Sequence, residues 1–182
     1  MSFDKAFSAT SSSQGEAVAS VPSVQGAFQA GVFADGLVVI LEAELSSTIA
    51  KFWAWALPGQ IQPVICTAFG DFFFQPAGGG SIYFFETQRG RTEFVGPDLG
   101  SFFNDFLPAD RIREHVLHEP LFRALKARLG SLAYGTCFIP EPWPLLGGSG
   151  NEDSFVVGRT DAYISLVSQT LKQLRDNTRS VQ

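Results

Sequence analysis

Residues 67–95, TAFGDFFFQPAGGGSIYFFETQRGRTEFV, constrain the fold more than any other stretch. Gly78, Gly79 and Gly80 lie between two segments rich in aromatic and branched residues, which favour a pleated sheet. A phosphate loop needs a helix after its glycines, because backbone N–H groups at the helix N-terminus hold the anion. The segment after these glycines is of strand type, and no Lys-Ser or Lys-Thr pair follows them. The pattern therefore predicts a β-hairpin and not a nucleotide loop.

Around this hairpin the sequence predicts further strands, all joined by Gly, Pro or short polar turns. The expected strands cover residues 36–44, 61–69, 71–75, 81–86, 91–95, 135–140 and 154–159. The run from 61 to 95 has the spacing of an antiparallel meander.

Helices are expected wherever apolar residues recur at helical spacing. The first is STIAKFWAWAL with Ser46 or Ser47 as its cap, and others cover 98–107, 109–117 and 119–130, the last ended by a left-handed Gly130. A final helix starts with Thr160 as cap and is expected to bury Ala162, Ile164, Leu166, Val167, Leu171 and Leu174. Helices packed around a mainly antiparallel sheet make the class α+β.

The 182 residues fit one domain. We expect a flexible N-terminal arm over 1–25 and a single α+β domain over 26–182. The arm lacks a positively charged start followed by an apolar stretch, so no secretory signal is expected. Cys66 and Cys137 each lie inside an expected strand, which favours two reduced, buried thiols over a disulfide and indicates a cytoplasmic protein.

The net charge of −5 argues against nucleic acid or an anionic membrane as partner, because both require a basic face. No apolar run reaches the roughly 18 residues that a membrane span needs. A basic protein partner would suit this charge better. The cations of residues 111–130 are expected to form a solvated helix face.

A search for reactive motifs gives no catalytic residue, metal site or cofactor. His115 and His118 are three residues apart with Glu114 and Glu119 beside them, but a third metal ligand is not apparent. GGSGN has Asn151 where a nucleophile motif needs glycine. Asp71, Glu86 and Glu93 could supply a pair of catalytic carboxylates for glycoside hydrolysis. We interpret them instead as charges on the outward face of a half-solvated sheet.

The order of these elements from Gly36 to Asp176 resembles the C-terminal domain family of bacterial type VI secretion immunity proteins, which neutralise a cognate DNase effector. Four segments carry the resemblance: GLVVILEAELSSTIAKFWAWALP, TAFGDFFFQPAGGGSIYFFET, LAYGTCFIPEPWPLLGGSGNEDSFVVG and DAYISLVSQTLKQL. Phe72 stands where the family has a tryptophan after Phe-Gly-Asp. The family has no established catalytic residues to transfer.

The resemblance implies a non-catalytic protein that binds a cognate toxin, here one with a basic nuclease groove, and blocks it. The expected partner-binding residues lie in the loop 141–153: Glu141, Trp143, Glu152 and Asp153. The alternative is that Trp143 packs into the protein's own core and does not contact the partner. A regulatory or peptide-binding module, an enzyme with an unmarked site, and a homo-oligomer formed through sheet edges also stay open. A deep pocket that holds His115 or His118 with a converging carboxylate would favour the enzyme.

Overall fold

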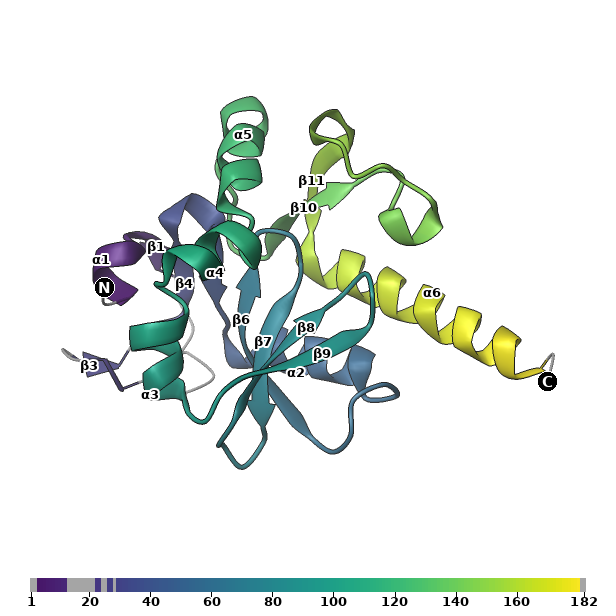
Figure 1. Cartoon of the computed structure of the whole chain (residues 1–182), viewed down its shortest axis with the longest axis horizontal. Coiled ribbons are helices and arrows are strands. Elements are labelled where there is room, and N and C mark those ends of the chain that lie inside the picture. The colour runs from purple at the N-terminus through teal and green to yellow at the C-terminus, as the bar shows by residue number, and fades with distance from the viewer. Residues whose placement is uncertain (1–2, 13–21, 24–25, 28, 181–182) are drawn as a thin grey trace.

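A seven-stranded antiparallel sheet forms the centre of the computed structural model, which describes residues 3–12, 22–23, 26–27 and 29–180 (Figure 1). Its strands, in spatial order, are β1 (Ala9–Ser12), β4 (Gly31–Phe33), β5 (Val38–Ile40), β6 (Ile61–Thr67), β7 (Phe72–Pro76), β8 (Ile82–Glu86) and β9 (Arg91–Gly96). Every neighbouring pair is antiparallel. The α+β class and the meander predicted for residues 61–95 are both confirmed.

The glycine triplet joins β7 to β8 in the predicted hairpin. Phe72 pairs with Phe85 and Phe74 with Tyr83 across the two strands. Gly79 and Gly80 have φ angles of 82° and 110°, which a side chain would oppose. The Gly79 N–H donates to the Pro76 carbonyl at 2.8 Å and closes the turn.

Side chains of the sheet alternate between two cores, as the pleat requires. Ile40, Ile65 and Phe73 belong to one core, and Phe72 and Phe74 belong to the other. The first core is covered by α1 (Phe3–Ala6), by α3 (Leu99–Ser101) with the π-helical turn η2 (Phe102–Phe106), and by α5 (Glu119–Leu129), which follows α4 (Asp110–His115). The second core lies under α2 (Ala43–Trp53) and α6 (Thr160–Ser180). Helices therefore cover both faces of the sheet.

The prediction of a flexible arm over residues 1–25 is wrong for residues 3–12. These residues form α1 and β1, and the Phe3 and Phe7 side chains are each 1% exposed. The Phe3 ring lies 5.3 Å from the Phe33 ring and 5.2 Å from the Phe103 ring. Two phenylalanines in a polar segment thus anchor it by burial. Within the rest of that range only the short strand β2 (Pro22–Ser23), which pairs with β3 (Gly26–Ala27), lies among the described residues.

The expected strand 36–44 and the helix after it have different bounds in the structure. The 3-10 turn η1 (Ala34–Gly36) precedes β5, and α2 already begins at Ala43. Ser46 is therefore not a cap: it lies inside α2 and its Oγ donates to the Pro63 carbonyl at 2.7 Å. The residue before the helix is Glu42, whose backbone N–H donates to the Tyr134 hydroxyl at 2.8 Å.

The helix predicted for 98–107 begins where expected but widens into a π-turn. Asp98 is its N-cap and accepts a hydrogen bond from the Ser101 N–H at 2.9 Å. The Leu107 N–H then donates to the Phe102 carbonyl, five residues back, at 2.9 Å. Phe102 and Phe103 are both fully buried by this arrangement.

The C-terminal part of the chain follows the predicted order of elements. β10 (Thr136–Pro140) and β11 (Phe155–Arg159) form a separate antiparallel pair, with the 3-10 turns η3 (Pro144–Leu146) and η4 (Glu152–Ser154) between them. Gly130 has φ 90° and ψ 176°, so it ends α5 outside the left-handed helical region that was predicted.

The buried stripe predicted for α6 is only partly right. Ile164 and Val167 are fully buried, but Ala162, Leu166 and Leu174 are exposed. Tyr163 and Ser168 take their places in the core. The second half of α6 extends away from the sheet, which leaves Leu174 in solvent (Figure 1).

Candidate functional site

A hollow of about 780 Å³ opens where the turns of the large sheet meet α5, α6 and the loop after β10. Its apolar wall consists of Phe69, Leu121, Pro140, Pro144, Leu145, Gly150, Phe155 and Leu171. Its polar groups are Asp71, Glu86, Gln88, Arg89, Arg91, His118 and Tyr163. Its volume is typical of ligand pockets, and an apolar wall with a few polar groups is the usual composition of a binding site.

The Phe-Gly-Asp turn between β6 and β7 supplies the floor of this hollow. The Thr67 N–H donates to the Asp71 carbonyl at 2.8 Å, and the Gly70 N–H donates to the Thr67 carbonyl at 3.2 Å. Gly70 has φ +80°, and a Cβ placed on it would lie 2.7 Å from Cε1 of Tyr163. Glycine is therefore required here both by the turn and by the close approach of the tyrosine ring.

The Asp71 carboxyl is held in place by the neighbouring turn. Its Oδ1 accepts a hydrogen bond from the Thr87 N–H at 2.8 Å, while the Thr87 hydroxyl donates to the Gly70 carbonyl at 2.7 Å. Burial, with a smaller contribution from nearby Glu86, raises the pKa of Asp71 to about 7 against the lowering effects of the Thr87 hydrogen bond and the Arg89 charge. The expectation that Asp71 is an outward surface charge is therefore wrong.

The turn between β8 and β9 forms a second wall. Arg89 Nη1 lies 2.5 Å from Glu86 Oε1, so these two charges neutralise each other. The Gln88 amide joins two other walls: its Nε2 donates to the Tyr163 hydroxyl at 2.5 Å and its Oε1 accepts from the Leu145 N–H at 3.2 Å. Gln88 thus fixes the loop and α6 relative to the sheet.

His118 enters the hollow from the junction of α4 and α5. It is the N-cap of α5 with φ 50° and ψ 43°, a left-handed conformation that is uncommon for histidine. Its ring lies 5.9 Å from the Phe69 ring in an edge-on contact. Burial lowers the pKa of His118, against the raising effect of Glu86, so the neutral imidazole is favoured.

The two histidines singled out in the sequence are separated by the structure. α4 ends at His115, and both histidines are exposed, but His118 lines the hollow and His115 does not. They therefore do not lie on neighbouring turns of one helix. Over the described part of the chain, no three His, Cys, Asp or Glu side chains gather closely enough to hold a metal ion.

The loop 141–153, predicted to bind the partner, forms the outer wall of the hollow. Pro144, Leu145 and Gly150 line it directly. Trp143 is partly buried against the second core, with its ring 5.8 Å from the Tyr163 ring and nearly perpendicular to it. Trp143 therefore helps to seat the loop on α6.

The three acidic residues predicted for the same interface point to solvent. Glu141, Glu152 and Asp153 are all exposed and lie outside the lining of the hollow. The Arg128 guanidinium holds this end of the loop by donating to the Glu152 carbonyl at 2.6 Å and to the Phe155 carbonyl at 3.0 Å.

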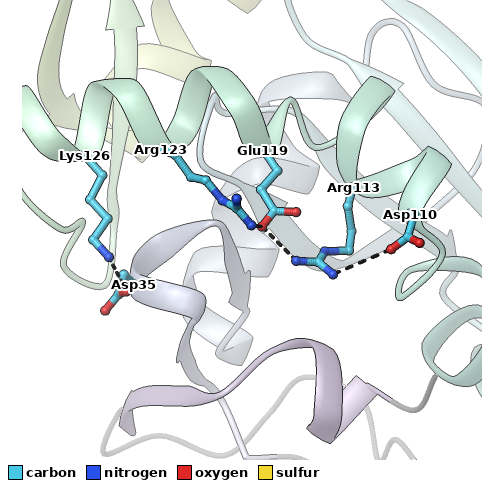
Figure 2. Close-up of polar contacts among 6 residues, drawn as sticks. All are labelled: Asp35, Asp110, Arg113, Glu119, Arg123 and Lys126. Atoms are coloured by element: carbon cyan, nitrogen blue, oxygen red, sulfur yellow. Dashed lines mark hydrogen bonds and ion pairs between the residues drawn. The ribbon is translucent and has the colours of Figure 1, made fainter.

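The basic stretch 111–130 is only partly the solvated helix face that was expected: Arg111, Arg123 and Arg128 are exposed, but Arg113, Arg123 and Lys126 form ion pairs (Figure 2). Glu119 Oε1 lies 2.7 Å from Nη2 of Arg113 and 2.7 Å from Nη2 of Arg123, and Lys126 pairs with Asp35. The Arg113 and Glu119 side chains are 19% and 15% exposed. The Arg113–Glu119 pair of this network joins α4 to α5 on either side of His118.

The remaining candidates for chemistry are two thiols and three carboxylates. Cys66 and Cys137 are free, buried thiols, as the sequence predicted, and burial raises the pKa of both. Of the carboxylates considered for acid–base pairs, Asp71 and Glu86 share the hollow, while Glu93 lies exposed on β9. Within the described residues, no helix is long and apolar enough to cross a bilayer.

Sequence reasoning missed most of this site. The sequence does not place His118 and Asp71 in one hollow: it gives His118 no carboxylate partner by name, and it favours a surface position for Asp71. The sequence signal that indicates this site is the Phe-Gly-Asp turn. A glycine at the end of a buried strand lets another element approach the backbone closely, here next to a carboxyl group.

Comparison with known proteins agrees with the resemblance seen in the sequence. Residues 98–170 match the family model described as "T6SS immunity protein Tdi1, C-terminal". No curated protein matches the chain. The crystal structure of Atu4351 from Agrobacterium tumefaciens is similar in fold, with a TM-score of 0.57 and 16% sequence identity over 78% of this chain and 70% of that chain.

The matched segment supplies much of the hollow. Among its lining residues, His118, Leu121, Pro144, Phe155 and Tyr163 all fall within residues 98–170. The part of the chain that matches an immunity-protein family is thus the part that builds one side of the candidate site.

Proposed function

We propose that this protein is a cytoplasmic immunity protein that neutralises a cognate secreted toxin by binding it directly, without catalysis. The observation that carries the proposal is the match of residues 98–170 to an immunity-protein family. The net charge of −5 supports a partner with a basic surface, such as the DNA-binding groove of a nuclease. Electrostatic attraction to such a groove would speed association.

We infer that the partner contacts the hollow and the loop 141–153 that borders it. Glu141, Glu152 and Asp153 offer exposed negative charge, and Leu146 in the same loop is 62% exposed. In this arrangement the rim charges act mainly on the association rate, while the walls of the hollow determine how long the complex lasts.

Co-expression tests the proposal. The product of each gene adjacent to this one is expressed in a sensitive host, alone and together with this protein. One of them should kill the host alone and be harmless in its presence, and the two purified proteins should form a stoichiometric complex. Failure to rescue against every adjacent gene product would refute the immunity function and favour the regulatory or peptide-binding alternative.

A second candidate function is acid–base catalysis in the hollow, because His118 lines it together with the Asp71 and Glu86 carboxyls. A left-handed histidine is also a form of backbone strain that clusters at functional sites. Titration separates the two candidates. A binder abolishes toxin activity only at about one equivalent, whereas an enzyme would do so at a small fraction of an equivalent. The enzyme would also lose this ability in the His118→Asn variant. Asparagine is chosen because it tolerates the left-handed backbone conformation of His118.

A further inference from the structure

We propose that the hollow receives a basic side chain of the protein partner, arginine or lysine, and that the Asp71 carboxylate is its ion-pair partner. That the occupant belongs to a protein rests on the proposed function. The preference for a cationic group does not, because it follows from the residues that line the hollow.

The first argument is that Asp71 has no ion pair of its own, although the nearby Arg89 charge lowers its pKa. Among the ion pairs of the described residues none includes Asp71, while its neighbour Glu86 is paired with Arg89 at 2.5 Å. The one hydrogen bond described for its carboxyl comes from the Thr87 N–H and goes to Oδ1. A desolvated carboxylate without a cation is costly, and an incoming cation would remove that cost.

The second argument is the shape and polarity of the walls. Phe69, Leu121 and Phe155 give the hollow an apolar wall against which the methylene stem of an arginine or lysine can pack while its charged end reaches the floor. The Phe69 and Phe155 rings, 6.0 Å apart, add aromatic surface of the kind that attracts a cation.

The basic groups of the hollow do not block such a ligand. The Arg89 side chain is 66% exposed and already paired with Glu86, and Arg91 is exposed. Water screens both of them, whereas Asp71 lies in a less hydrated position. His118 is exposed, but its partial desolvation lowers its pKa and favours the neutral form. The order of charges, acidic at the floor and basic at the rim, selects a cation at the floor.

The test uses N-acetyl-L-arginine amide as probe and N-acetyl-L-citrulline amide, its neutral analogue of nearly the same shape, as control. Amide resonances of Gly70, Thr87 and Tyr163 are followed by NMR during titration of the full chain. The arginine amide should shift these resonances, and the citrulline amide should leave them unchanged. Equal shifts with both probes, or no shift with the arginine amide, would overturn the proposal.

Variants and pH provide a second measurement. Because the pKa of Asp71 is about 7, its ionised fraction rises from about one tenth at pH 6 to about nine tenths at pH 8, and the affinity for the arginine amide should rise about ninefold. Other titratable groups close to Asp71 are Glu86, Arg89, His118, Tyr163, Cys66 and Cys137. Asp71→Asn, which keeps the acceptor for Thr87, should abolish binding, and Glu93→Gln on the exposed edge should not.

The experiment also separates this proposal from the function on which it rests. The probe requires no toxin. If the arginine amide binds but the protein rescues no host, the preference of the hollow for cations is supported and the immunity function is refuted. Rescue by the wild type and by Asp71→Asn alike, with no binding of the probe, would remove this proposal alone.

Discussion

Replacing Gly70 by alanine should destabilise the protein more than the same replacement at Gly59. The two glycines have similar φ angles, +80° and +74°, so each alanine incurs a similar backbone strain of about 1–2 kcal/mol. A Cβ at Gly59 meets no atom within 4 Å, whereas at Gly70 it would lie 2.7 Å and 2.8 Å from two carbons of the Tyr163 ring.

The Tyr163 ring cannot easily move aside. It is 2% exposed, and Gln88 holds its hydroxyl at 2.5 Å. Overpacking of this kind costs about 1–3 kcal/mol, so Gly70→Ala should lower the free energy of unfolding by about 2–5 kcal/mol in total. For a chain of this length each kcal/mol corresponds to a fall in Tm of about 2–4 °C.

Urea unfolding followed by tryptophan fluorescence gives both free energies on the same scale. The added cost at Gly70 should also largely disappear in a Tyr163→Ala background, where the ring is absent. Equal losses at Gly70 and Gly59 in the wild-type background would refute the close approach of the turn to α6, and with it the floor of the hollow.

Three further predictions concern charges and thiols. Arg113→Ala should lower the Tm more than Lys126→Ala, because the Arg113 side chain is 19% exposed and that of Lys126 is 38% exposed, and exposed pairs contribute only about 0–1 kcal/mol. Asp71→Asn should become more stable relative to the wild type as the pH rises from about 4 to 8. Burial raises the pKa of Asp71 to about 7, so the folded wild type keeps this carboxyl protonated at the lower pH values. At the higher pH values it must hold a buried negative charge, which lowers its stability and which the variant lacks. Cys66 and Cys137 should resist a thiol reagent until the protein unfolds, because burial raises the pKa of both thiols.

Each of these predictions has a contrary outcome. Equal Tm values for the Arg113 and Lys126 variants would mean that the network joining α4 to α5 contributes little. A stability difference between Asp71→Asn and the wild type that does not change with pH would place Asp71 in contact with bulk water. Rapid labelling of either thiol in the native protein, measured by mass spectrometry, would contradict the packing of the second core.

The strands were predictable because their signal is local. Alternating aromatic and branched residues in residues 61–95 specify strands, and Pro76 and Gly79 specify where a turn must occur. The C-terminal helix was equally clear in its position. The buried face of this helix was harder to predict. Periodicity places Leu174 on that face, but α6 has already left the core before it reaches Leu174.

The N-terminal segment and the site depended on contacts between residues distant in the sequence. Phe3 and Phe7 lie in a polar stretch whose composition indicates a loose arm. Only the fold reveals them as core residues, because Phe3 packs against Phe103 and Phe7 packs against Phe3. The position of Asp71 was also hidden in the sequence. The side chains around it, among them Tyr163, belong to elements about ninety residues away along the chain. The loop 141–153 borders the hollow, while the roles of Glu141, Trp143, Glu152 and Asp153 in binding stay predictions.

The walls of the hollow come from the sheet turns, from the start of α5, from the loop after β10 and from α6, whose contribution ends at Leu171. A chain emerging from the ribosome therefore has no complete pocket until Leu171 has been added. Under the proposed function, copies that end before Leu171 would give no protection.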